Sequence, residues 1–149
     1  MTEDKTNQWD TLAGDLLTEF TDTKSRPVGG GRTITYIDAR QVMTRLDECL
    51  GINNWTDEYT VLDLNSGAVE CALSIHAYGE TVTHRDVGYP QSATAPDKLK
   101  AAYSDALKRA AVKFGIGRHL YADAGDNAWT EDAPPVNAIP ERQWNDDPP

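Results

Sequence analysis

The chain has 149 residues, of which 39% are hydrophobic, and a formal net charge of −10. This length accommodates one compact domain with tails, because two separate cores would not fit comfortably. The sequence shows neither an apolar run near the roughly 20 residues that a membrane-spanning helix needs nor a secretory signal, so we expect a soluble cytoplasmic protein with no membrane partner.

The negative charge is concentrated at the two ends of the chain. Residues 1–23 contain six acidic residues and one lysine, and residues 123–149 contain seven acidic residues and one arginine. Residues 24–122 contain twelve basic and eleven acidic residues. The chain is therefore divided into an N-terminal acidic helix or arm (1–23), a nearly neutral central domain (24–122) and an acidic tail (123–149), and its acidic average does not exclude a nucleic-acid partner.

Two features precede the central domain's main elements. Apolar residues at helical spacing predict a helix over residues 9–20, with a stripe that docks either on the core or on a neighbour. The three glycines at 29–31 indicate a flexible connection or a close approach of the backbone, and they lack the Gly-Lys-Ser/Thr of a phosphate-binding loop. A short strand is predicted to begin over residues 33–35.

A second helix is predicted to begin after Asp38. Its side chain is suited to cap the helix, and Gln41 stands at the reciprocal position of a capping box. Apolar residues then recur at helical spacing up to Leu50, and Gly51 follows as the stop signal.

Three strands are predicted over residues 55–64, 68–78 and 80–88, with turns at "NSG" and "YGE". These strands should form an antiparallel meander. The middle strand alternates apolar and polar residues, which predicts that helices cover one face of the sheet. The residues expected on that face are Val69, Cys71, Leu73, Ile75 and Ala77. Cys71 and Cys49 are the only cysteines, and their apolar surroundings favour buried free thiols over a disulfide.

The segment "KLKAAYSDALKRAAVKFGIGRHLY", residues 98–121, holds six basic residues and one acidic residue. Asp97 should open a helix that ends near Gly115. One side of the helix carries an apolar stripe, namely Leu99, Tyr103, Ala106, Leu107, Ala110 and Phe114. Lys98, Arg109 and Lys113 lie close together on another side, and Lys108 stands apart. These cations either solvate an exposed helix or form a track for phosphates, with aromatic side chains stacking on bases.

Signals for enzymatic chemistry are weak. His76, His84 and His119 are scattered, and no pair of histidines or cysteines has metal-ligand spacing. We therefore expect no enzyme, no metal and no cofactor, with a metal-dependent nuclease built from distant carboxylates as the alternative.

Residues 123–149 are rich in proline and acidic residues and have no periodicity, so we expect them to be disordered. Trp129 and Trp144 stand isolated in this tail. It either solvates the domain, competes with DNA for the cations, or binds a partner, for which an exonuclease, a recombinase or a single-strand binding protein would be suitable.

Five segments in order are similar to the Rad52/Rad22 family of single-strand annealing proteins. They are "SRPVGGGRTITYIDARQV", the helix that ends near "NNW", the meander, "RDVGY" and "KAAYSDALKRAAVKFGIGRHLY". Together they cover about residues 24–122, and "SDALKRAAVKFGIGR-LY" especially resembles the bacterial DNA-damage-response protein A branch. The resemblance implies an α+β fold with an antiparallel β-β-β-α core, a meander of three to four strands packed on a long helix, and flanking helices.

The resemblance also implies a function and a binding site. Family members form rings whose basic groove holds the backbone of single-stranded DNA, so that the outward-facing bases can pair without ATP or metal. Arg26 and Tyr36 match groove positions, and Lys108 and Arg109 match the chief phosphate contacts. Charge and proximity add four residues to the predicted DNA-binding set: Arg32, Lys98, Lys113 and Arg118.

The expected function is thus single-stranded DNA binding and annealing in recombination or break repair, in a phage or a bacterium. Two alternatives stay open: a protein that coats and protects single strands or 3′ ends without annealing them, and a scaffold whose basic helix is an assembly surface. The chain departs from eukaryotic relatives in two places. At Val112 the relatives carry a basic residue, and the segment over residues 90–98 is shorter than theirs and lacks the lysines of their second DNA site.

Overall fold

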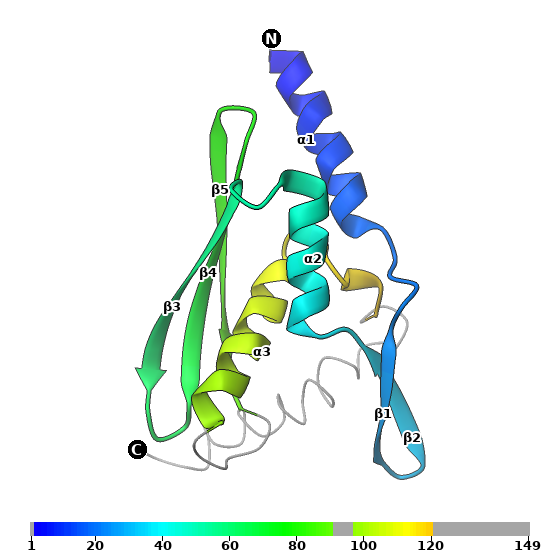
Figure 1. The fold of residues 1–149 in the computed structure, drawn as a ribbon, viewed down its shortest axis with the longest axis vertical. Helices are drawn as coiled ribbons and strands as arrows, with labels where there is room; N and C mark the ends of the chain where they lie inside the picture. The colour runs from blue at the N-terminus through cyan, green and yellow to red at the C-terminus, as the bar shows by residue number, and fades with distance from the viewer. Residues whose placement is uncertain (1, 91–96, 121–149) are drawn as a thin grey trace.

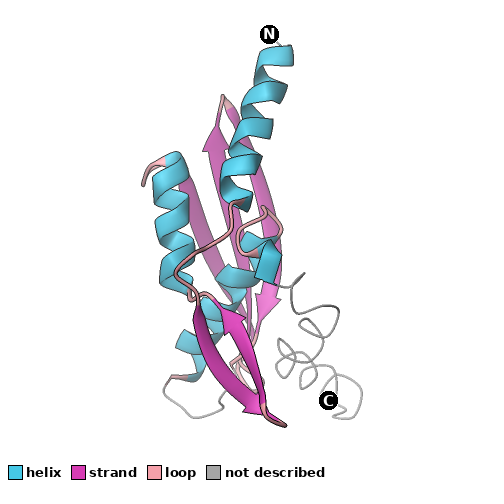
Figure 2. Cartoon of the chain, turned by 90° about the vertical axis from the view of Figure 1, so that its right-hand side faces the viewer, coloured by secondary structure: helices cyan, strands magenta, loops and turns pink. Residues whose placement is uncertain are grey.

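The computed structural model describes residues 2–90 and 97–120. Within these residues, a layer of helices covers one face of a three-stranded sheet. A two-stranded hairpin lies at the end of the molecule opposite the start of the first helix (Figures 1 and 2). The elements in chain order are α1 (Thr2–Leu17), β1 (Lys24–Gly29), β2 (Arg32–Tyr36), α2 (Ala39–Leu50), β3 (Trp55–Asp63), β4 (Ala68–Ala77), β5 (Glu80–Gly88) and α3 (Lys98–Val112). The predicted α+β class with an antiparallel β-β-β-α core is confirmed.

The meander has the predicted order and direction. β4 lies in the middle, and it pairs antiparallel with β3 on one side and β5 on the other. The turn between β4 and β5 consists of Tyr78 and Gly79, both with positive φ, at 54° and 77°. Two consecutive left-handed residues match the twist of a tight hairpin, so "YGE" ends one strand and starts the next.

The predicted apolar face of β4 forms the centre of the core. Val69, Cys71, Leu73 and Ile75 are each 0% exposed, whereas Ala77, near the turn, is only partly buried. The face is covered by α3, whose small residues allow the helix to lie close to the sheet; Ala102, Ala106, Ala110 and Ala111 are fully buried. Cys71 and Cys49 are free thiols, and Cys71 is buried as predicted, whereas Cys49 is only partly buried.

Helix α3 and the sheet approach each other closely at Gly88, the last residue of β5. A Cβ atom at this position would lie 2.2 Å from the backbone nitrogen of Ala106 and 2.8 Å from the carbonyl oxygen of Ala102. Only a residue without a side chain fits here, which fixes where α3 crosses β5.

Helix α2 begins and ends as its sequence predicts. Asp38 Oδ1 accepts a hydrogen bond from the Gln41 amide at 2.9 Å, and the Gln41 side chain accepts one from the Asp38 amide at 2.8 Å. The helix ends before Gly51, whose N–H donates to the Asp47 carbonyl.

The glycines at 29–31 form the tip of a hairpin, which the sequence analysis did not predict. β1 and β2 pair antiparallel, and the short strand expected over residues 33–35 is β2. All three glycines have positive φ, and no atom lies within 4 Å of where a Cβ would stand on any of them. They therefore permit a tight turn, not a close approach of the backbone.

The apolar stripe of α1 docks on this chain's own core. Leu12 and Leu16 are each 3% exposed within it. Trp9 packs edge-on against Tyr78 and donates from Nε1 to Glu80 at 2.7 Å, which ties α1 to the β4–β5 turn. The helix ends at Leu17, so Phe20 belongs to the segment that follows it.

Among the described residues, none of the helices combines the length and the apolarity that crossing a membrane requires. The acidic tail, with Trp129 and Trp144, lies outside the described residues, and so do the expectations about its disorder and partners.

Candidate nucleic-acid interface

Three predicted site residues from distant parts of the sequence meet at the base of the hairpin. The Arg26 guanidinium lies 5.8 Å from the centre of the Tyr36 ring, and Lys108 Nζ lies 5.7 Å from the same centre. Lys108 also donates a hydrogen bond to the Ile37 carbonyl oxygen at 3.2 Å. We refer to Arg26, Tyr36 and Lys108 as the cation–aromatic cluster.

Strand geometry explains why the hairpin contributes two members of this cluster. Side chains alternate between the two faces of a strand, and directly paired residues share a face. Lys24 pairs with Tyr36 and Arg26 pairs with Ile34, so these four side chains lie on one face, together with that of Arg32. The other face carries Ser25, Pro27, Thr33 and Thr35, none of them charged.

The position of Lys108 depends on the residue that follows the hairpin. Ile37 is 6% exposed and belongs to the core, so it holds the end of β2 beside α3. Burial lowers the pKa of Lys108, and Arg26 and Arg109 lower it further, while Asp105 and Asp38 act in the opposite direction. An anion placed beside Lys108 would favour the charged ammonium and so offset the effect of its burial.

Lys24 is a further cation of this surface that the sequence analysis missed. Its ammonium lies 3.7 Å from Asp38 Oδ2, while Oδ1 of the same carboxylate caps α2. Lys24 stands two residues before Arg26, a spacing that puts both on one face of a strand, but no strand was predicted over residues 24–29.

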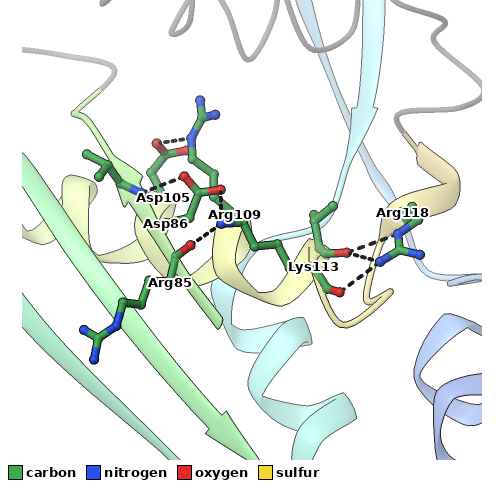
Figure 3. A network of polar contacts seen from close by, with 8 residues as sticks. Arg85, Asp86, Asp105, Arg109, Lys113 and Arg118 are labelled. Carbon is green, nitrogen blue, oxygen red and sulfur yellow. Dashed lines mark hydrogen bonds and ion pairs between the residues drawn. The ribbon is translucent and has the colours of Figure 1, made fainter. Parts of the chain in front are cut away.

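The other predicted residues do not join the cluster. Arg109 is 8% exposed and donates from Nε to Asp105 at 2.8 Å. Lys98 donates to the Asn65 carbonyl, and Arg118 donates to the Val112 and Lys113 carbonyls at the end of α3. Figure 3 shows that these contacts of Arg109 and Arg118 lie within the chain.

Lys113 and Arg32 complete the predicted set. Lys113 donates to the Arg85 carbonyl and lies 3.8 Å from Asp86, which connects α3 to β5 (Figure 3). Arg32 is exposed at the start of β2, opposite Gly29. Lys108 therefore contacts the hairpin, whereas Lys98, Arg109 and Lys113 contact other parts of the chain. This agrees with the predicted separation of Lys108 from these three residues around α3.

The three histidines make contacts within the fold. His76 lies between the hydroxyls of Thr56 and Thr81, at 3.2 and 3.0 Å. His84 packs edge-on against Phe114, and burial lowers its pKa. His119 accepts a hydrogen bond from the Phe20 amide at 3.3 Å. In residues 2–90 and 97–120, no three His, Cys, Asp or Glu side chains are grouped so that they could hold a metal ion.

The cation–aromatic cluster combines the groups that bind a nucleic-acid strand. Cationic donors pair with phosphate oxygens, and an aromatic face beside them can stack on a base. The arrangement therefore suits a strand gripped by its backbone.

This chain belongs to the Rad52/22 family of double-strand break repair proteins, whose profile it matches over residues 11–135. It is also similar to two curated bacterial proteins named single-stranded DNA-binding protein DdrA. Identity is 40% over 89 residues with the protein from Deinococcus radiodurans and 40% over 93 residues with that from Deinococcus deserti. Each match covers 59% of this chain and 40% or 41% of the relative, so the chain spans about two fifths of the relatives' length.

Proposed function

We propose that this protein binds single-stranded DNA through the cation–aromatic cluster and acts in DNA repair by annealing complementary strands. The single observation that carries the proposal is the meeting of Arg26, Tyr36 and Lys108 at one place on the surface. Membership of a break-repair family and similarity to proteins named for single-stranded DNA binding support it.

The binding energy comes mainly from electrostatics. Phosphates that pair with Lys108 and Arg26 release counterions, which makes affinity dependent on salt and nearly independent of sequence. Stacking of one base on Tyr36 adds about 1–3 kcal/mol. On the same hairpin face, Arg32 extends the positive surface toward the tip, and Lys24, which pairs with Tyr36, adds a cation at the base.

Annealing follows if many copies hold one strand in line. We propose that protomers form a closed ring, as a head-to-tail interface does when its rotation closes, and that their clusters make a continuous groove. The groove would hold the backbone and leave the bases free to pair. Base pairing then supplies the free energy, and neither ATP nor a metal takes part.

Annealing is tested with two complementary labelled oligonucleotides in buffer without nucleotide or metal. We expect the protein to accelerate duplex formation clearly above the spontaneous rate. Protection of single strands from a nuclease without acceleration would select a coating protein instead, an alternative that the relatives' name, single-stranded DNA-binding protein, favours. Tight assembly with no salt-dependent DNA binding would leave only the scaffold. Native mass spectrometry that shows monomers alone under binding conditions would contradict the ring.

Asp38→Asn is expected to raise the affinity for single-stranded DNA by about two- to fivefold, because it removes a negative charge from beside Lys24 and near Lys108. Asparagine is also a good capping residue, so α2 should keep its capping box and its stability. Fluorescence anisotropy at low salt measures the change, and thermal unfolding checks the fold. Unchanged or weaker binding by a folded variant would show that Asp38 does not compete with phosphates.

A further inference from the structure

The basic side chains of α3 have two different surroundings. Lys108 points toward the hairpin, where it contacts Ile37 and Tyr36. Its neighbour Arg109 lies about 100° further round the helix and is buried against Asp105. Adjacent basic residues therefore do not share one role.

The buried pair joins the helix to the end of the sheet. Asp105 Oδ2 accepts from Arg109 Nε at 2.8 Å and from the backbone N–H of Tyr89 at 3.0 Å. Tyr89 directly follows Gly88, where β5 touches the backbone of α3. The Asp105–Tyr89 hydrogen bond is thus one residue along each element from the tight contact between Gly88 and Ala106.

This geometry fixes the rotation of α3. Asp105 is 9% exposed, so its charge is tolerated because Arg109 compensates it and hydrogen bonds satisfy it. If the pair were broken, the helix could rotate or shift on β5, and Lys108 would lose its place beside Tyr36. A guanidinium committed to a buried carboxylate is also poorly placed to neutralise a phosphate.

We propose that Arg109 is a positioning residue: it acts through Asp105 and the Tyr89 amide to orient α3, and it does not itself bind the DNA backbone. This inference rests on the proposed function, because the residue being oriented is Lys108 of the cation–aromatic cluster. It assigns different roles to the two adjacent cations that the sequence resemblance treats as a pair.

The test compares three variants of the full chain: Arg109→Gln, Arg109→Gln with Asp105→Asn, and Lys108→Gln as the matched loss of one cation. The double variant removes both charges of the pair, and asparagine retains an oxygen that can accept from Tyr89 N–H. Affinity for a labelled oligothymidylate is measured against salt concentration, with thermal unfolding and exchange of the Tyr89 amide as structural readouts.

We expect Arg109→Gln to lower the melting temperature, to speed exchange of the Tyr89 amide and to weaken binding with a lower salt slope, because Lys108 is displaced from its phosphate contact. Adding Asp105→Asn should restore most of the affinity, the wild-type salt slope and the protection of the amide. Lys108→Gln should instead reduce the salt slope by about 0.7, the value for one phosphate contact on a single strand, with unchanged amide exchange.

Two results would overturn the proposal. One is a folded double variant with a protected Tyr89 amide whose salt slope falls as far as that of Lys108→Gln, because Arg109 would then bind a phosphate. The other is wild-type melting and amide exchange in Arg109→Gln. A wild-type protein that binds no single-stranded DNA would refute the proposed function instead, and amide exchange would still decide whether Arg109 holds α3 on β5.

Discussion

Lys108→Gln is expected to weaken the binding of single-stranded DNA by about tenfold to a hundredfold, which corresponds to the loss of one charged hydrogen bond of about 1.5–3 kcal/mol. The ammonium is partly buried between α3 and the hairpin, so it is held in place before DNA arrives. A preorganised cation loses little side-chain entropy on binding, which makes it worth more than a mobile surface lysine.

Lys100→Gln is the matched control, because Lys100 lies on the same helix, is exposed, and undergoes the same change of charge. We expect it to change the affinity by less than about threefold. Adding Arg26→Gln to Lys108→Gln should lower the affinity again, with a second decrease in salt slope. Equal effects of the two single lysine variants would mean that the cation–aromatic cluster is not the binding site and that only net charge matters.

Gly88→Ala is expected to destabilise the fold by about 3 kcal/mol or more, which exceeds the usual cost of overpacking a core by one methyl group, about 1–3 kcal/mol. The added Cβ would meet backbone atoms of Ala106 and Ala102, not flexible side-chain ends, so the whole helix must move. Because a domain of this size has a free energy of unfolding of about 5–15 kcal/mol, much of its stability would be lost. Urea unfolding followed by circular dichroism measures the effect.

Gly14→Ala is the control with the opposite sign. Gly14 lies in α1, and nothing stands within 4 Å of a Cβ added there. Alanine at an unstrained helical position should stabilise the protein by about 0.4–1 kcal/mol. If Gly88→Ala unfolded at the same urea concentration as the wild type, α3 would not be packed on β5 as described, and the positioning of Lys108 would need another explanation.

Local signals predicted much of the fold. The capping box of α2 depends on two side chains three residues apart, and the strands of the meander depend on alternation and on turn residues next to them. These interactions are made within a few residues of the chain, so the sequence displays both partners together.

The hairpin was missed for the opposite reason. The proline in β1 and three successive glycines obscure the strand pattern, and the pairing of β1 with β2 is visible only once the glycine turn is known to close. The face shared by Lys24, Arg26 and Tyr36 follows from that pairing, which is why Lys24 was absent from the predicted set.

The sequence by itself determined the class of fold, the family, and the division of α3 into an apolar stripe, one group of cations and the separate Lys108. Only the tertiary structure decided what each cation faces: Tyr36 and Ile37 for Lys108, Asp105 for Arg109, and the Arg85 carbonyl for Lys113. The physical reason is that helical periodicity fixes the direction of a side chain around its own axis. Its partner is set by how that helix packs on other segments, and here the packing depends on the contact at Gly88.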